Sequence, residues 1–227
     1  MKNVKRFWRL KMRVILASAS PRRKELLGNI YSEFEVIPST VEENIEFTNV
    51  EDYVKELAYI KAMDVYNMIK SERENKNDTL FDENVNDGIL IIGADTIVYN
   101  DGKVLGKPKD EEDAKKMIRS LAGKKHQVYT GVCLISNGKV DSGEASGMDD
   151  LVVQKFYSKT DVYVDDITDK EIADYVATGD PLDKAGSYGI QGVFSKHIRR
   201  IDGDYFNVVG LPVNEIYRQL DGLLNWK

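Results

Sequence analysis

The sequence predicts an α/β protein with a mixed, twisted β-sheet flanked by helices. Short apolar runs typical of buried strands alternate along the chain with segments whose apolar residues recur at helical spacing. Residues 89–98 are apolar at both alternating sets of positions, as expected for a central strand that is covered on two faces. The sequence contains no internal repeat and no low-complexity tract, which argues against a repeat architecture.

The N-terminal half begins with a predicted strand and helix. Residues 13–17 form a short apolar run, and Ser20 and Pro21 then supply the N-cap and the first helical residue that helix starts favour. Residues 51–69 predict a longer helix, because their apolar side chains recur with helical periodicity. Between these two helices we expect a strand at 34–37 and an acidic, polar loop.

The C-terminal half continues the alternation of strands and helices. Asn100, Asp101 and Gly102 follow the central run and predict a tight hairpin. Thr168 and Glu171 have the spacing of a capping box at a helix start. The other expected elements are a helix at 110–121, strands at 127–135 and 151–164, a strand within 203–212, and a final helix at 211–224.

Two polar stretches, 71–88 and 136–150, interrupt this alternation. The first is rich in Asn, Asp and Glu and the second in Gly, so both predict insertions at the surface. We expect residues 1–12 to form a loose N-terminal extension and residues 13–227 to form a single domain.

Composition and charge argue against several function classes. The 227 residues carry 32 Lys and Arg against 38 Asp and Glu, and the net charge of −6 predicts no general attraction to nucleic acid or to an anionic membrane. The sequence shows no secretory signal and no membrane-spanning segment, so we expect a cytoplasmic protein. The single cysteine, Cys133, lies in an apolar run, which predicts a small core residue and argues against a disulfide or a cysteine-based metal site.

Two charged residues stand where the pattern predicts burial. Asp95 lies at the end of the apolar run 89–98, where an ionised carboxylate is costly unless it is paired, hydrogen-bonded or bound to a cation. It could be a general base or metal ligand at the carboxyl end of a strand, or it could cap a turn or pair with a lysine. Lys61 lies on the core-facing side of helix 51–69, so its ammonium group needs an anion unless the stem carries the charge to solvent. A phosphate ligand or the Asp95 carboxylate could be that anion.

A candidate phosphate-binding segment joins the first strand to the first helix. Ser18, Arg22 and Arg23 place a hydroxyl and two guanidinium groups at a helix N-terminus, where free N–H groups and the helix dipole favour an anion. The alternative is a solvated face of the first helical turn. Lys107, between Gly106 and a proline, is a second basic residue held by a rigid segment, and this short pattern alone is weakly specific.

Residues 183–192 combine three glycines, a tyrosine and an amide, which suits backbone approach to a flat ligand, although a plain turn would have the same composition. Gln191 in this segment can donate and accept, as reading the edge of a base requires. His126 and His197 have no partner motif, so we expect both to be structural and exclude a serine triad or a histidine-rich metal site.

These segments together resemble one family, the Maf nucleotide pyrophosphatases. The resemblance covers the chain from about residue 14 to residue 220, and six motifs in the same order make it specific. The matching stretches are 16–23, 93–96, 106–108, 126–131, 183–192 and 210–212. The resemblance implies a fold related to the inosine-triphosphate pyrophosphatases, with two lobes around a cleft, and a homodimer.

The resemblance also implies a role for each matching residue. Asp95 would be the proton acceptor, with Lys61 and Lys107 as further catalytic residues and Glu43 beside Asp95 at a metal. Ser18, Arg22, Arg23, Lys61 and Lys107 would surround the triphosphate, and Arg22, Thr96 and Gln191 would determine base choice. The pattern at Thr96 and at 188–191 is similar to the subgroup that acts on dTTP and UTP.

The implied reaction is hydrolysis of a nucleoside triphosphate to the monophosphate and pyrophosphate, with Mg²⁺ or Mn²⁺ bridging the triphosphate and the carboxylates. Asp95 would activate the water that attacks the α-phosphorus. Two alternatives remain from the sequence: a nucleotide-binding regulator of cell division or septum formation, and a pyrophosphatase for inosine or xanthosine triphosphate.

Overall fold

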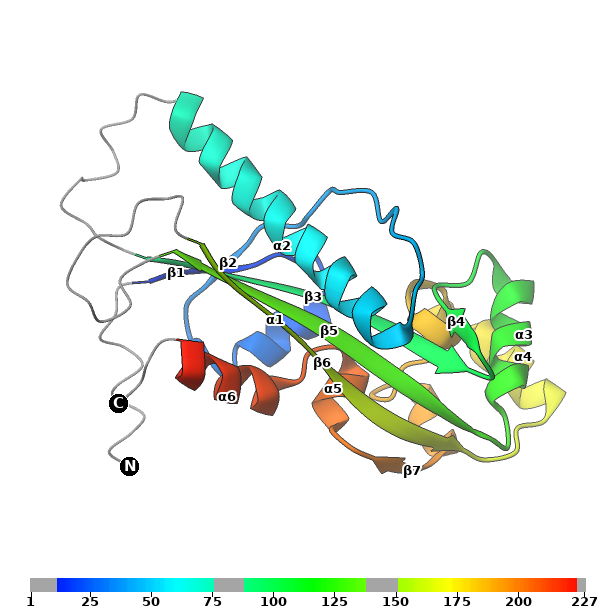
Figure 1. Ribbon diagram of the computed structural model, residues 1–227. Helices are drawn as coiled ribbons and strands as arrows, with labels where there is room; N and C mark the ends of the chain where they lie inside the picture. Colours follow the sequence, from blue (N-terminus) through cyan, green and yellow to red (C-terminus); the bar gives the residue numbers. More distant parts are fainter. Residues whose placement is uncertain (1–11, 76–87, 138–150, 224–227) are drawn as a thin grey trace.

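The computed structural model describes residues 12–75, 88–137 and 151–223, and it contains a seven-stranded mixed sheet (Figure 1). The strand order is β2-β1-β3-β5-β6-β7, and β4 pairs with β3 outside this path. Strand β1 is parallel to both neighbours, and every other pairing is antiparallel. The strands are β1 (Arg13–Leu16), β2 (Glu35–Val36), β3 (Ile89–Asn100), β4 (Lys103–Leu105), β5 (Lys125–Asn137), β6 (Leu151–Val164) and β7 (Ile198–Asp202).

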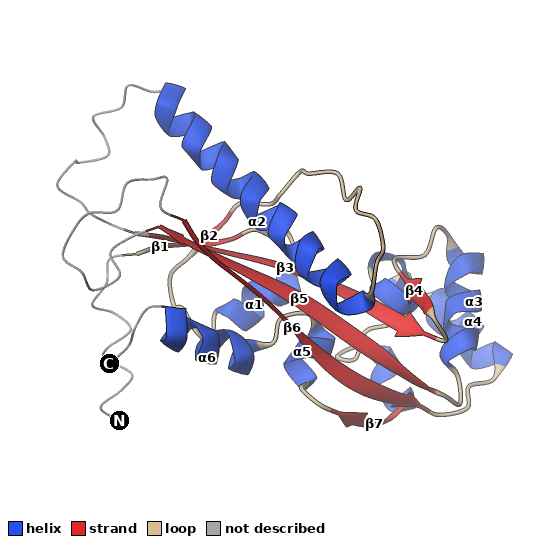
Figure 2. Ribbon diagram, viewed as in Figure 1, coloured by secondary structure: helices blue, strands red, loops and turns tan. Residues whose placement is uncertain are grey.

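Helices cover both faces of the sheet, as Figure 2 shows, so the predicted α/β class is confirmed. The helices are α1 (Pro21–Leu27), α2 (Val50–Asn75), α3 (Glu111–Leu121), α4 (Asp169–Val176), α5 (Tyr205–Val209) and α6 (Val213–Leu223), and the 3₁₀ turns are η2 (Asp180–Asp183), η3 (Ala185–Ser187) and η4 (Val193–His197). None of the helices in the described ranges is both long and apolar enough to cross a membrane.

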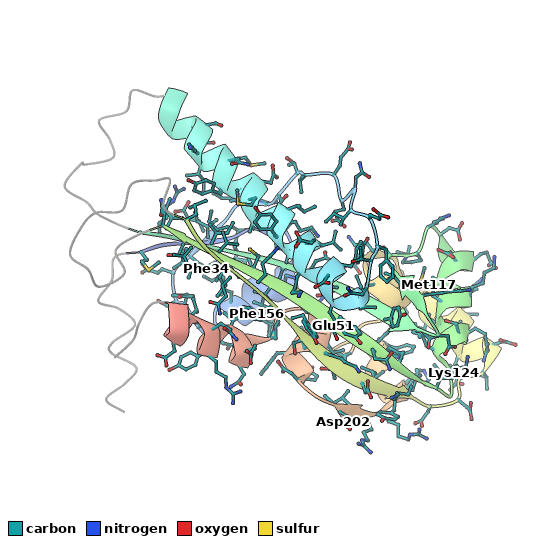
Figure 3. The ribbon with its side chains drawn as sticks, in the orientation of Figure 1. Phe34, Glu51, Met117, Lys124, Phe156 and Asp202 are labelled. Carbon is teal, nitrogen blue, oxygen red and sulfur yellow. The ribbon has the colours of Figure 1, made fainter. Side chains whose placement is uncertain are left out.

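The core divides according to the face of the sheet. Helix α2 packs on one face, against alternate residues of β1, β3 and β5 that include Ile91 and Cys133. Helices α1, α5 and α6 pack on the opposite face against Leu90 and Ile92, and Figure 3 labels Phe156 of β6, whose ring packs against this cluster. Helices α3 and α4 enclose a further cluster at the β4 end of the molecule. The predicted burial of Cys133 is confirmed.

Helix α2 lies unusually close to the sheet because two glycines face it. A Cβ atom at Gly93 would be 2.4 Å from the carbonyl oxygen of Ala58, and one at Gly131 would be 2.0 Å from that of Val54. Any side chain at either glycine would push the helix away. This contact sets the height of α2 above β3, and it places Lys61, one turn after Ala58, over the same strand.

Strand β3 has a stretch with an open edge. Its side towards β1 is paired as far as Ile92, and pairing resumes with β4 at Val98. Among the described residues no strand pairs with positions 93–97 on this side, although β5 pairs with them on the other. Asp95 and Thr96 fall within this stretch, and successive residues of a strand point to opposite faces.

Most predicted elements are confirmed, including the helix starts and the hairpin. The hydroxyl of Ser20 accepts a hydrogen bond from Arg23 N, and Thr168 forms the complete capping box with Glu171. Asp101 and Gly102 have φ angles of 48° and 79°, so the hairpin turn occupies the left-handed region expected of it.

Three predictions are corrected. The strand expected within 203–212 is the short helix α5: the Asp204 carboxylate caps it by accepting from Phe206 N, and the preceding segment forms β7 instead. Asp95 is not at the end of its strand, because the hairpin prolongs β3 to Asn100. Residues 71–75 continue helix α2 and residues 136–137 continue strand β5, although the sequence predicts that both stretches begin surface insertions. The rest of the two expected insertions, 76–88 and 138–150, lies outside the described residues except for Gly88.

Met12, the last residue of the expected N-terminal extension, packs against the core cluster beneath α1 and α6. The remainder of the expected extension, 1–11, lies outside the described residues.

Both histidines are buried in the aromatic region near α4, which agrees with structural roles. His126 Nε2 lies 2.7 Å from the Tyr188 hydroxyl, and its Nδ1 has no hydrogen-bond partner among the described atoms. Burial lowers the pKa of His126 to about 4. A proton on Nδ1 would be a buried donor without an acceptor, so the native state keeps this imidazole neutral.

This burial predicts a pH dependence of stability. Between pH 6.5 and about 4 the unfolded chain binds a proton at His126 that the native state does not bind, so the free energy of unfolding falls as the pH drops through this window. We expect a slope of up to about 1.4 kcal/mol per pH unit from this residue. Urea unfolding at pH 7.0, 6.0 and 5.0 measures it, and an equal slope in His126→Gln would contradict the assignment.

Candidate active site

The ammonium group of Lys61 joins two carboxylates on the α2 face of the sheet. Its Nζ is 2.5 Å from Asp95 Oδ1 and 2.8 Å from Glu43 Oε1. The side chains of Lys61 and Asp95 are 16% and 13% exposed, whereas that of Glu43 is 51% exposed. The core-facing orientation predicted for Lys61 is confirmed, and the residue pairs with carboxylates rather than carrying its charge to solvent alone. One oxygen of Asp95 therefore has a cation partner, and Oδ2 has no protein partner in the described residues.

Helix α2 also positions the loop that carries Glu43. The Asp64 carboxylate oxygen Oδ2 accepts from the Ser39 hydroxyl and from Thr40 N, both at 2.8 Å. Asp64 lies three residues after Lys61, so both residues lie on one side of the helix. The loop is thus attached to the helix that holds the lysine, and this attachment brings Glu43 to the lysine.

Arg23 organises a second group of side chains beside the first. Its guanidinium donates to Ser18 Oγ at 3.2 Å, to Thr96 Oγ1 at 3.1 Å and, through Nε, to the carbonyl of Gly210 at 2.9 Å. Burial lowers the pKa of the Arg23 guanidinium, while the charge of Asp95 acts in the opposite direction. Arg23 thus lies within electrostatic reach of the Asp95 group, although it bonds to Thr96 on the other face of β3.

The predicted residues Arg22, Gln191 and Lys107 are placed less tightly. Arg22 Nη1 lies 3.8 Å from Asp183 Oδ2, which joins α1 to the glycine-rich segment 183–192. Gln191 in that segment is exposed and makes no hydrogen bond to the described residues. The segment is also joined to the hairpin region, since Gly186 N donates to Gly106 O at 3.0 Å.

Lys107 follows Gly106 directly, so its backbone lies beside the glycine-rich segment, but its exposed side chain makes no ion pair within the described ranges. The structure therefore forms two separate groups of contacting side chains. Lys61 contacts Asp95 and Glu43 in the first group, and Arg23 contacts Ser18 and Thr96 in the second. Arg22 precedes Arg23 in α1 and contacts the glycine-rich segment through Asp183, whereas Gln191 lies in that segment and Lys107 follows Gly106, which bonds to it.

Sequence reasoning missed the support beneath that segment. The Asp180 carboxylate accepts from the Tyr175 hydroxyl at 2.7 Å and from Lys184 Nζ at 2.9 Å. A Cβ atom at Gly189 would be 2.8 Å from Cε of Lys184, so the turn packs directly on this ion pair. The i,i+4 spacing of Asp180 and Lys184 is compatible with an ion pair, but it does not indicate that the turn at Gly189 packs on it.

Sequence reasoning also missed Thr130 and Asn207, two fully buried polar residues that stand behind Thr96. Thr130 Oγ1 lies 2.9 Å from Thr96 Oγ1 and donates to the backbone carbonyl of Asn207 at 3.0 Å. A signal for Thr130 was present, since it is a polar residue in the otherwise apolar face of a predicted strand, as Asp95 is.

The carboxylates of Glu43 and Asp95, which both contact Lys61, could hold a divalent cation if substrate phosphates supplied further ligands. Glu43 and Asp95 converge on one point, because both contact the same ammonium nitrogen. No group of three His, Cys, Asp or Glu residues in the described part of the chain could hold a metal ion. Mg²⁺ is commonly held by one or two carboxylates with substrate phosphates and water supplying the other oxygens, so two carboxylates suffice.

The fold and this site define an α/β protein with a largely buried lysine–carboxylate pair and a hydrogen-bonded arginine at an open strand edge. The family model for Maf-like proteins matches residues 13–223, and the chain belongs to the Maf family.

Three proteins with the name dTTP/UTP pyrophosphatase are similar over almost their full lengths. The protein of Agathobacter rectalis is 47% identical, covering 91% of this chain and 95% of its own length. That of Clostridium perfringens strain SM101 is 43% identical, covering 92% and 96%. That of Caldicellulosiruptor bescii is 42% identical, covering 93% and 94%.

Proposed function

We propose that this protein hydrolyses dTTP and UTP to the monophosphate and pyrophosphate. The observation that carries the proposal is the contact of Lys61 with both Glu43 and Asp95, whose strand also carries Thr96, a partner of Arg23. A carboxylate for proton removal thus lies next to cationic groups that suit a phosphate chain. The name and the similarity of the three relatives support the choice of dTTP and UTP as substrates.

The reaction is an attack of water on the α-phosphorus. Asp95 Oδ2 accepts a proton from the water as its oxygen bonds to phosphorus, and the bond from the α-phosphorus to the bridging oxygen breaks. Pyrophosphate leaves with the electrons of that bond. Lys61 holds Asp95 through Oδ1, so the carboxylate keeps the other oxygen for the water. Ser18, Arg22, Arg23, Lys61 and Lys107 bind the triphosphate, and the positive charges of the four basic residues offset the negative charge on the leaving group.

The cofactor we propose is Mg²⁺ or Mn²⁺, held by Glu43 and Asp95. When bound, it supplies positive charge beside the phosphate oxygens and polarises the phosphorus centre. Glu43 and Asp95 would hold the cation, and Lys61, which contacts both carboxylates, would offer its remaining N–H donors to a phosphate. The homodimer and the cytoplasmic location that we expect from the sequence stay predictions.

A substrate panel tests the proposal. The purified full-length protein is incubated with Mg²⁺ and one of dTTP, UTP, dCTP, CTP, ITP or XTP, and pyrophosphate and monophosphate are both quantified. We expect equimolar products, the highest kcat/KM with dTTP and UTP, and loss of turnover in excess EDTA.

The other outcomes of the panel identify the alternatives. A preference for ITP or XTP would replace the pyrimidine assignment with purine pyrophosphatase activity. Tight nucleotide binding without turnover in either metal would contradict the enzyme and favour a nucleotide-binding regulator. Release of inorganic phosphate instead of pyrophosphate would contradict attack at the α-phosphorus.

A further inference from the structure

Behind Thr96 lies a chain of buried hydrogen bonds that the proposed reaction does not use. Thr130 stands directly opposite Thr96 in the β3–β5 register, and their hydroxyl oxygens are 2.9 Å apart. Thr130 is fully buried and its Oγ1 donates to the carbonyl oxygen of Asn207 in α5 at 3.0 Å. The Asn207 side chain donates in turn to Val128 O and to Thr160 Oγ1, which fixes α5 on the sheet.

The direction of each hydrogen bond in this chain follows from the acceptors. A carbonyl oxygen can only accept, so the single hydroxyl proton of Thr130 points to Asn207. Thr130 Oγ1 must then accept from Thr96, whose own proton is used in that bond. The other nearby acceptor, Gly210 O, is 3.5 Å from Thr96 Oγ1 and already accepts from Arg23 Nε.

Thr96 Oγ1 therefore has one free position, and that position is an acceptor. A hydroxyl oxygen has two lone pairs, and Arg23 Nη2 donates to one of them at 3.1 Å. The remaining lone pair belongs to a partly exposed residue at the open edge of β3. A bound molecule that meets Thr96 can form a hydrogen bond there only by donating one.

We propose that Thr130 is a positioning residue for substrate choice, which holds Thr96 as a pure acceptor for a donor group of the nucleoside. This inference rests on the proposed function and extends it. Uracil and thymine carry a proton on ring nitrogen N3, whereas N3 of cytosine has none and would face the Thr96 lone pair with its own. A sugar hydroxyl is the other donor of a nucleotide, and it presents the same chemistry to Thr96.

Thr130 has a role beyond packing, because its hydroxyl fixes the direction in which Thr96 donates its proton. Without its hydroxyl the proton of Thr96 has no partner at 2.9 Å and becomes free to rotate towards the ligand. Thr96 could then donate to cytosine N3 as well as accept from uracil N3. Loss of the Thr130 hydroxyl should thus weaken discrimination, and it does so without any contact between Thr130 and the substrate.

The test compares Thr130→Val with a matched control, Thr160→Val. Thr160 is also a fully buried threonine whose hydroxyl donates to a backbone carbonyl, that of Asp204 at 2.9 Å. It accepts from the Asn207 side chain but has no hydrogen bond to Thr96, so it controls for a loosened α5. We measure kcat/KM for UTP, CTP, dTTP and 3′-deoxythymidine triphosphate, and the melting temperature of each variant. Binding of UMP and CMP by calorimetry gives the same base ratio without turnover.

We expect Thr130→Val to lower the UTP/CTP ratio of kcat/KM by about 5- to 10-fold, the value of one hydrogen bond in discrimination. Thr130→Ser should keep the parental ratio, since it retains the hydroxyl. Thr160→Val should lower the melting temperature by an amount comparable to that in Thr130→Val and keep the parental UTP/CTP ratio of kcat/KM. If the valine variant does not fold, Thr130→Ala replaces it, and we expect the same decrease in the UTP/CTP ratio.

A parental UTP/CTP ratio in Thr130→Val would contradict the assignment of base N3–H as the donor to Thr96. If the preference for dTTP over the 3′-deoxy analogue falls instead, the donor is the sugar hydroxyl and the role of Thr130 stands. If neither preference changes, the positioning role is wrong while the hydrolysis by the parent protein is unaffected. A parent protein without turnover contradicts the proposed function, and the UMP and CMP binding ratio then decides the inference alone.

Discussion

Replacing Asp95 with asparagine should lower kcat for dTTP by about 10²–10⁴-fold, the usual contribution of a positioned base. Asparagine has nearly the same shape as aspartate, but its amide cannot take the proton of the attacking water. The fold should persist, because Lys61 retains Glu43 at 2.8 Å as a partner for its charge. Pyrophosphate release measures the turnover, and thermal unfolding followed by circular dichroism measures the fold.

The matched control is Asp101→Asn in the hairpin. Asp101 is exposed and adopts a positive φ that asparagine tolerates well, so the same chemical change should leave both kcat and the melting temperature at parental values. An Asp95→Asn protein that hydrolyses dTTP at the parental rate would remove the proton acceptor from the proposed mechanism.

The sequence indicated Asp95 and Lys61, the proposed catalytic residues, because both break an apolar pattern. Asp95 interrupts a strand that is apolar at both alternating sets of positions, and Lys61 interrupts the core-facing stripe of a helix. A charge at such a place is costly without a partner, so the exception itself carries the information. Local patterns also identified the Ser20 cap and the hairpin at Asp101, since each depends on only a few neighbouring residues.

What the sequence could not provide were contacts between distant elements. The sequence offered Asp95 or a phosphate as the anion for Lys61 and left the choice open. The pairing with Asp95 requires α2 to rest on Gly93 and Gly131, and nothing local to these glycines indicates which backbone will approach them. Helix α5 reads locally as a strand, and it becomes helical because the Asn207 side chain bonds to Val128 O and Thr160 on two strands. Tertiary hydrogen bonds there override the local β preference.

Replacing Lys61 with methionine should lower kcat/KM for dTTP by at least about 10²-fold, as expected for loss of a cationic group that stabilises a phosphoryl transition state. Methionine preserves the packing of the stem against the sheet, so the change removes mainly the charge. We also expect the free energy of unfolding to fall by about 1–3 kcal/mol, less than for a fully enclosed ion pair because Glu43 is half exposed. Urea unfolding and steady-state kinetics measure the two effects.

Lys55→Met is the matched control on the same helix. Lys55 pairs with Asp52 at 2.8 Å at the surface, so its loss should cost at most about 1 kcal/mol and should leave kcat/KM unchanged. Equal losses of activity in the two variants would show that methionine disturbs α2 as a whole.

The double variant Lys61→Met/Asp95→Asn separates the charge effect from packing. With Lys61 removed, Asp95 and Glu43 converge on one point with no ammonium group between them, and the repulsion adds to the cost of the single change. Asparagine at position 95 removes that repulsion, so the double variant should be more stable than the sum of the single losses predicts, by about 0.5–3 kcal/mol. Strict additivity would mean that the lysine and the aspartate do not interact in solution, and the arrangement that supports proton removal beside the phosphate chain would then lose its basis.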